Sequence, residues 1–151
     1  MKLLLDSNIV IDYLACRKPF CESARKLMML GYVHEFDLHL GTSQIGDIYY
    51  VMTHADARLS HVEAIDRLRR LRAFMEVCSL DSAGFDRALD SGWPDFDDAC
   101  VYQVARSIRA DAIITRNQKD FAMSSIKVFD CDQLFAWIEA EYDVSYDEID
   151  F

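Results

Sequence analysis

Residues 93–121 read WPDFDDACVYQVARSIRADAIITRNQKDF and join a helix pattern to a strand pattern. Pro94 and the acids at Asp95, Asp97 and Asp98 predict the start of a helix over 96–109, because acidic side chains cap helix N-termini and favour the first turn. The continuous apolar run over 112–115 then predicts a buried strand. A helix that leads directly into a short apolar strand is typical of α/β proteins, and this stretch therefore decides the fold class.

The same alternation extends through the rest of the chain. Short apolar runs predict strands at 2–5, 38–40, 77–80 and 126–129. Helical spacing of apolar residues predicts helices at 7–14, 20–33, 43–54, 59–75, 82–90 and 131–142. This order predicts an α/β fold with a central parallel sheet and helices on both faces. We expect one domain over 1–142 and an acidic tail over 143–151 that is frayed or packs across a neighbour.

Composition and charge restrict the class of protein. The chain has 151 residues, of which 52% are hydrophobic, and this excludes a disordered protein. The low content of five glycines and two prolines argues against a turn-rich all-β fold. No run is long enough to span a membrane, and the N-terminus has no signal-peptide pattern, so we expect a cytoplasmic protein. The net charge is −10, but residues 128–151 carry eight acids and no base. The body is therefore nearly neutral, which leaves an anionic substrate possible.

The cysteines and histidines show no metal-binding pattern. The five cysteines have no C-x-x-C spacing, and the four histidines form no H-E-x-x-H motif. We interpret all five cysteines as small core residues of a reducing compartment.

Acidic and amide residues follow several of the predicted strands. Asp6 ends the strand over 2–5, Asp47 lies one turn into a helix that follows a strand, and Asp98 lies in the first turn of the helix over 96–109. Asn117 and Asp120 follow the strand over 112–115. The carboxyl ends of parallel strands share one edge of the sheet, where ligands bind, so these side chains are expected to converge. Crowded carboxylates require a counter-charge, and hard cations such as Mg²⁺ or Mn²⁺ prefer oxygen ligands.

Each of these residues also has a structural interpretation. Asp6 could cap the helix that begins near Ser7, and Asp47 could be a solvated helix residue. Asp95 and Asp97 are better explained as a cap and a first-turn acid. Asn117 and Asp120 could be turn residues. A metal site is therefore indicated by the acidic and amide residues together and not by any one of them.

Five segments resemble the PIN-domain family, and most closely the VapC-like ribonuclease toxins of type II toxin–antitoxin systems. They are LLLDSNIVIDYL at 3–14, TSQIGDIYYVM at 42–52, DFDDACVYQVA at 95–105, ADAIITRNQKDF at 110–121 and IKVFDCDQLF at 126–135. The resemblance implies a three-layer α/β/α sandwich and a Mg²⁺- or Mn²⁺-dependent endoribonuclease. It also implies an RNA substrate, a cognate antitoxin and a homodimer.

The resemblance assigns roles to individual residues. Asp6 matches the first acid of the family and Asp98 the third, whereas Asp47 stands where many members carry Glu and Asn117 where many carry a fourth Asp. These residues form the expected catalytic set, and Asp6, Asp47, Asp98 and Asp120 form the expected metal set. Ser7, Asn8 and Thr115 match polar positions that could orient ligands or water, and Arg116 and Lys119 are expected to hold a phosphate. A further arginine group, formed by Arg58, Arg67, Arg69, Arg70 and Arg72, is either a solvated helix face or a phosphate contact.

Two functions from different classes follow. The first is a divalent-metal-dependent ribonuclease, and the second is a catalytically weak PIN-like module that binds RNA or a protein. A flavodoxin-like nucleotide or phosphoryl-acceptor domain is disfavoured, because no glycine-rich phosphate loop follows the first strand.

Overall fold

The centre of the molecule is a five-stranded parallel sheet. We describe residues 1–55 and 58–146 of a computed structural model. The strands are β1 (Lys2–Leu5), β2 (Asp37–Gly41), β3 (Met75–Cys78), β4 (Ala112–Ile114) and β5 (Lys127–Phe129), in the order β3-β2-β1-β4-β5. Each adjacent pair is parallel, and β1 lies between β2 and β4. The chain order therefore reverses beside β1, which is where open α/β sheets bind ligands.

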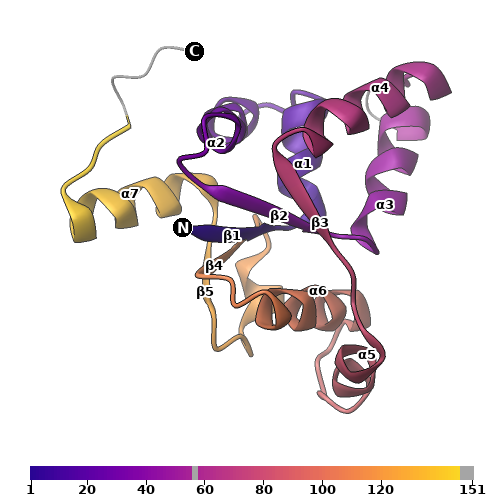
Figure 1. The fold of residues 1–151 in the computed structure, drawn as a ribbon, viewed down its shortest axis with the longest axis vertical. Coiled ribbons are helices and arrows are strands. Elements are labelled where there is room, and N and C mark those ends of the chain that lie inside the picture. The colour runs from indigo at the N-terminus through magenta and orange to yellow at the C-terminus, as the bar shows by residue number, and fades with distance from the viewer. Residues whose placement is uncertain (56–57, 147–151) are drawn as a thin grey trace.

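Helices cover both faces of this sheet (Figure 1). One face carries α1 (Ser7–Leu14), α2 (Cys21–Tyr32), α3 (Gln44–Tyr50), α4 (His61–Arg72) and α7 (Cys131–Tyr142), and the other carries α5 (Ser82–Leu89) and α6 (Phe96–Ser107). A π-helical turn, η1 (Val51–Ala55), extends α3, and a 3₁₀ turn, η2 (Gln118–Phe121), follows β4. The predicted three-layer α/β/α sandwich is confirmed.

The central strand supplies side chains to both halves of the core. Leu3 and Leu5 belong to the cluster beneath α1, α2, α3, α4 and α7, whereas Leu4 belongs to the cluster beneath α6. All three leucines are fully buried. This is why a continuous apolar run, and not an alternating one, marks β1 in the sequence.

One predicted helix was too long. We expected residues 59–75 to form a single helix, but α4 ends at Arg72. Met75 begins β3, where it pairs with Leu38 and is buried. A buried methionine fits the apolar face of a helix as well as a strand, so its spacing from Leu71 was uninformative.

Residues 143–145 of the tail are exposed, but Tyr146 packs on the body, where we expected a tail that is frayed or packs across a neighbour. Asp143 adopts a left-handed conformation at the end of α7 and reverses the chain. Tyr146 is then buried against Phe36 and Phe135, and its hydroxyl donates a hydrogen bond to Glu35. Residues 147–151, the remainder of the predicted tail, lie outside the described residues.

The interpretation of the cysteines was wrong for one pair. Cys16 and Cys21 form a disulfide between α1 and α2, with their Cα atoms 4.7 Å apart. Four residues separate the two cysteines, and this spacing matches no short cysteine motif. The pairing becomes visible only in the structure, where the turn between α1 and α2 brings the two side chains together. Cys100 and Cys131 are buried as expected, and Cys78 is half-buried.

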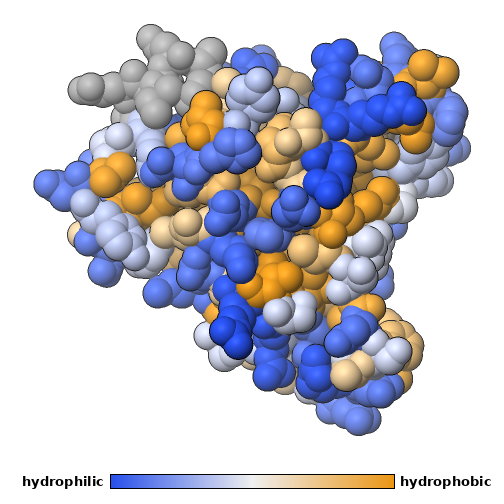
Figure 2. Space-filling view, in the orientation of Figure 1, coloured by the Kyte–Doolittle hydropathy of each residue, from blue (hydrophilic) through white to orange (hydrophobic). Residues whose placement is uncertain are grey.

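The sheet edge at β3 carries an apolar groove. Ile45, Leu68, Leu71 and Val77 line it, and hydrophobic residues are visible between α4 and β3 in Figure 2.

Within the described part of the chain, no helix has both the length and the apolar character needed to cross a bilayer.

Candidate metal centre

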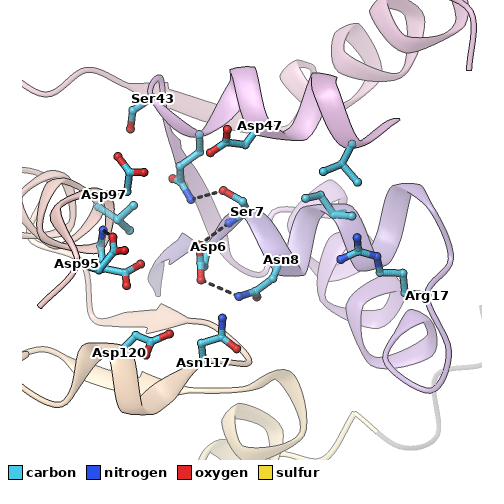
Figure 3. A pocket seen from close by; sticks show the side chains of 15 residues that line it. Asp6, Ser7, Asn8, Arg17, Ser43, Asp47, Asp95, Asp97, Asn117 and Asp120 are labelled. Carbon is cyan, nitrogen blue, oxygen red and sulfur yellow. Dashed lines mark hydrogen bonds between the residues drawn. The ribbon is translucent and has the colours of Figure 1, made fainter. Parts of the chain in front are cut away.

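An acidic cavity lies at the carboxyl ends of the central strands, where the chain order reverses. Its walls come from the N-termini of α1, α3 and α6 and from the segment after β4 (Figure 3). Six carboxylates line it, those of Asp6, Asp47, Asp95, Asp97, Asp98 and Asp120. Ser7, Asn8, Gln44 and Asn117 add oxygen and nitrogen atoms to the same wall. We call this cavity the acidic cup.

Asp6 is held rigidly at the base of the acidic cup. It is the N-cap of α1, and the Ser7 backbone N–H donates to its Oδ1 at 2.7 Å. The Asn8 side-chain amide and the Thr115 hydroxyl both donate to its Oδ2, each at 2.7 Å. A carboxylate offers about four acceptor positions, so these three donors leave room for one further ligand. Both interpretations of Asp6, as cap and as member of an acidic group, therefore hold together.

Thr115 links the two chain segments that meet beneath the acidic cup. Its hydroxyl is fully buried and accepts hydrogen bonds from the Asn117 backbone N–H at 3.0 Å and from the Asn8 amide at 3.1 Å. Asn8 in turn accepts from the Arg116 backbone N–H at 3.2 Å. This network fixes the turn after β4 to the start of α1, and so it sets the position of Asn117 relative to Asp6.

Gln44 positions the wall that carries Asp47. Its buried side chain accepts a hydrogen bond from the Gly41 N–H at 2.8 Å and donates to the Leu5 carbonyl at 3.1 Å. The first turn of α3 is thereby attached to the ends of both β1 and β2, and Asp47 follows one turn later on an exposed surface. Our sequence reasoning missed Gln44. The only available signal was a polar residue in the first turn after a strand.

The first turn of α6 supplies three of the acids. Asp95 is the N-cap and accepts a hydrogen bond from the Asp98 N–H at 3.1 Å, as its capping interpretation required. Asp95 and Asp97 also line the acidic cup, which that interpretation did not anticipate. Asp98 is half-buried, and desolvation raises its pKa to about 7, with further contributions from the charges of Asp95, Asp6, Asp120 and Asp97. Asp98 therefore lies in a partly desolvated site, where the negative field of its neighbours also opposes ionisation.

The same field acts on Asp6. Burial raises the pKa of its carboxyl, and the hydrogen bonds from Thr115, Ser7 and Asn8 oppose that rise. The charge of Asp120, from the 3₁₀ turn after β4, adds to the increase. Asp6, Asp98 and Asp120 thus interact although they lie on three separate segments.

Three of the predicted substrate-positioning residues do not line the acidic cup. Thr115 acts from beneath it, as described above, and Lys119 is exposed outside it. Arg116 is also directed elsewhere, because its Nε lies 2.7 Å from Oδ2 of the fully buried Asp12. Phe20 covers its guanidinium, with the ring centroid 4.4 Å away. Arg116 compensates a buried charge, so its expected role in holding a phosphate is not supported.

The chemistry of the acidic cup fits a hard divalent cation. Its acidic groups are all carboxylates, and the charges of Asp95, Asp6, Asp120 and Asp97 add to the desolvation that raises the pKa of Asp98. Among the described residues, no three acidic, histidine or cysteine side chains already converge as a preformed cage. Mg²⁺ usually retains several waters and takes only one or two carboxylates directly, so such a cage is not required.

Comparisons with known proteins agree with this geometry. The ribonuclease VapC1 of Aquifex aeolicus is 21% identical over 132 residues, which cover 84% of this chain and 88% of that protein. The VapBC-1 structure from nontypeable Haemophilus influenzae aligns with a TM-score of 0.63 and 18% identity, over 87% of this chain and 99% of that one. The sarcin-ricin loop cleaving toxin VapC20 of Mycobacterium tuberculosis aligns with a TM-score of 0.56 and 14% identity, over 74% and 86% of the two chains.

The family profile covers most of the molecule. The PIN domain profile matches residues 2–119, a range that includes β1 to β4 and every residue that lines the acidic cup except Asp120. The chain belongs to the PIN domain family.

Proposed function

We propose that this protein is a divalent-metal-dependent endoribonuclease that hydrolyses phosphodiester bonds of RNA, and that it acts as the toxin of a toxin–antitoxin pair. The observation that carries the proposal is the convergence of Asp6, Asp47, Asp98 and Asp120 in one cavity of a PIN domain. The ribonuclease name of the Aquifex relative supports the reaction type.

The proposed centre divides its work among the residues of the acidic cup. Asp6, Asp47 and Asp98 would hold the cation, Mg²⁺ or Mn²⁺, with Asp120 and Asn117 in support. A bound divalent cation would neutralise the scissile phosphate and lower the pKa of a water molecule. Ser7 and Asn8 keep the Asp6 carboxylate in place through the hydrogen bonds already described. The exposed Asp47 has a shorter arm than a glutamate, so a water molecule is expected to bridge it to the cation.

A cleavage assay with purified protein tests the proposal. Wild type, Asp6→Asn and Asp98→Asn are incubated with RNA and either Mg²⁺, Mn²⁺ or a chelator. We expect metal-dependent cleavage by the wild type and a loss of at least one hundredfold in both variants, on the order expected when charged groups are removed from a metal centre. Equal cleavage by all three proteins would assign the activity to a contaminant or to another site.

A second candidate is a PIN-like module that binds RNA or a protein without efficient turnover. The exposed position of Asp47 and the neutral side chain of Asn117 favour it, because both reduce the charge available at the cation. RNA binding that persists without any metal-dependent cleavage would select this candidate.

We further propose an antitoxin partner, a homodimeric toxin and a cytoplasmic location. The first rests on structural neighbours that are toxin–antitoxin assemblies, among them a complex from Klebsiella pneumoniae. Expression of the chain with and without the product of an adjacent small gene tests the partner. We expect growth arrest only when the chain is expressed alone, and arrest in both cases would argue against that partner.

A further inference from the structure

Among the described residues, Arg17 is the only basic side chain that lines the acidic cup. It comes from the connection between α1 and α2, at a distance in sequence from the assigned acids. In Figure 3 its guanidinium points from that connection toward the space enclosed by the carboxylates. Arg17 is half-buried, whereas the adjacent Lys18 is exposed and does not line the cavity.

The backbone around Arg17 is fixed at both ends. Its own N–H donates to the Asp12 carbonyl at 3.1 Å, and its carbonyl accepts from the Cys21 N–H at 2.8 Å. The disulfide between Cys16 and Cys21 closes the same segment into a small ring. Phe20, within that ring, packs on Arg116, which pairs with Asp12. The fold therefore fixes the backbone from which the Arg17 side chain extends.

The charge of the acidic cup explains why a basic residue is useful at this position. Six carboxylates repel the phosphates of an RNA strand, and a cation within the cavity relieves this repulsion only locally. An arginine at the rim remains charged at every relevant pH, and its planar guanidinium can donate two parallel hydrogen bonds to one phosphate.

We propose that Arg17 binds the phosphate backbone of the RNA substrate at the mouth of the acidic cup. The proposal rests on the proposed ribonuclease function and transfers to Arg17 the role that we first expected of Arg116. The competing interpretation is that Arg17 only balances the charge of the carboxylates within the folded protein.

Binding and cleavage by matched variants distinguish these roles. Wild type, Arg17→Ala, Arg17→Lys and Lys18→Ala are titrated into a fluorescently labelled pool of single-stranded RNA across a series of salt concentrations. Ca²⁺ replaces Mg²⁺ in the binding assay, because it takes similar oxygen ligands with less strict geometry. The KM and kcat of cleavage are measured in parallel with Mg²⁺ or Mn²⁺, and thermal unfolding confirms that each variant is folded.

We expect Arg17→Ala to weaken RNA binding by about tenfold or more, as the loss of a charge-assisted hydrogen bond implies. The slope of log affinity against log salt should fall by about 0.7, the contribution of one phosphate contact in a single strand. Arg17→Lys should recover part of the affinity, and Lys18→Ala should stay within about twofold of the wild type. In cleavage the loss should fall mainly on KM.

Other outcomes overturn the proposal or separate it from the proposed function. Equal losses in Arg17→Ala and Lys18→Ala, or an unchanged salt slope, would leave Arg17 with a purely structural role. Wild-type cleavage together with no effect of Arg17→Ala on affinity or KM would overturn the Arg17 assignment alone. RNA binding that depends on Arg17 without any cleavage would instead remove the ribonuclease function and retain the assignment. Absence of RNA binding by the wild type would overturn both.

Discussion

The substitution Asp98→Asn should stabilise the metal-free protein while it removes activity. Desolvation and four neighbouring carboxylates raise the pKa of Asp98 to about 7 from the model-compound value of 3.8. Its folded-state pKa is therefore above its unfolded-state pKa, so charging this group opposes folding. The associated stability is fully present below pH 3.8 and is lost as the pH rises through about 7.

The size of the effect follows from the same shift. A rise from 3.8 to about 7 corresponds to about 4 kcal/mol if it is taken at face value. Because Asp98 is only half-buried, solvent screening reduces the penalty to about 1–2 kcal/mol. Asparagine also loses the attraction of a carboxylate to the N-terminus of α6, which costs about 0.3–1 kcal/mol. The net gain is about 1 kcal/mol at pH 8 and near zero below pH 3.8, where Asp98 is protonated in both the folded and the unfolded state.

Thermal unfolding in the presence of EDTA measures this difference. For a domain of this size, 1 kcal/mol corresponds to a change in Tm of about 2–4 °C. Asp98→Asn should therefore unfold at a higher temperature than the wild type at pH 8 and at a similar temperature at about pH 3.5. Addition of Mg²⁺ or Mn²⁺ should stabilise the wild type more than the variant. Asp86→Asn, an exposed acid of α5 that does not line the acidic cup, is the matched control for the change of charge. A variant that is destabilised at pH 8, or that shows the same difference at both pH values, would refute the reasoning.

Three further predictions concern the supports of the fold. Thr115→Val should lower the free energy of unfolding by about 1.5–3 kcal/mol, because Asp6 loses a buried hydrogen bond, whereas Thr115→Ser should retain most of the stability. Urea denaturation measures both variants, and equal losses would point to packing instead of the hydrogen bond. Replacement of both Cys16 and Cys21 by alanine should lower the free energy of unfolding by about 2 kcal/mol, because the unfolded chain is no longer constrained by the disulfide. Dithiothreitol should lower the Tm of the wild type but not that of the double variant, and the same response in both proteins would argue against the disulfide. Tyr146→Ala should lower the free energy of unfolding by about 1.5–3 kcal/mol through lost burial, and Tyr146→Phe by about 1 kcal/mol through the lost hydrogen bond to Glu35. An unchanged Tm after Tyr146→Ala would show that Tyr146 does not pack on the body in solution.

The sequence was most informative where local pattern and burial agree. Leu3, Leu4 and Leu5 form an unbroken apolar run because both faces of β1 are covered, and such a run is recognisable without a structure. The cap of α6 was predicted at Asp95 from the acids that precede its helical pattern, and it was found there. The edge rule for parallel sheets then brought Asp6, Asp47, Asp98 and Asp120 to one cavity.

The errors arose where a side chain is determined by a distant partner. Arg116 directly precedes Asn117, which lines the acidic cup, and this position suggested a role in the cavity. The Arg116 side chain instead pairs with the buried Asp12 of α1. Neither residue shows this pairing by itself, because Asp12 occupies an apolar helix face as a single polar exception. Arg17 was overlooked for the opposite reason, since nothing in its local sequence indicates that it lines the same cavity as the acids.

Asp6 and Asp98 make different contributions to the same centre, and the difference explains why neither alone is sufficient. Three hydrogen-bond donors fix the Asp6 carboxylate, so little conformational entropy would be lost there when a cation binds. The same donors also partly neutralise the negative charge of this carboxylate. No side-chain hydrogen bond of this kind compensates Asp98 among the described contacts, and burial together with the neighbouring carboxylates raises its pKa to about 7. In the proposed metal centre, a cation would gain position from Asp6 and electrostatic attraction from Asp98. The repulsion that lowers the stability of the metal-free protein would then contribute free energy to metal binding.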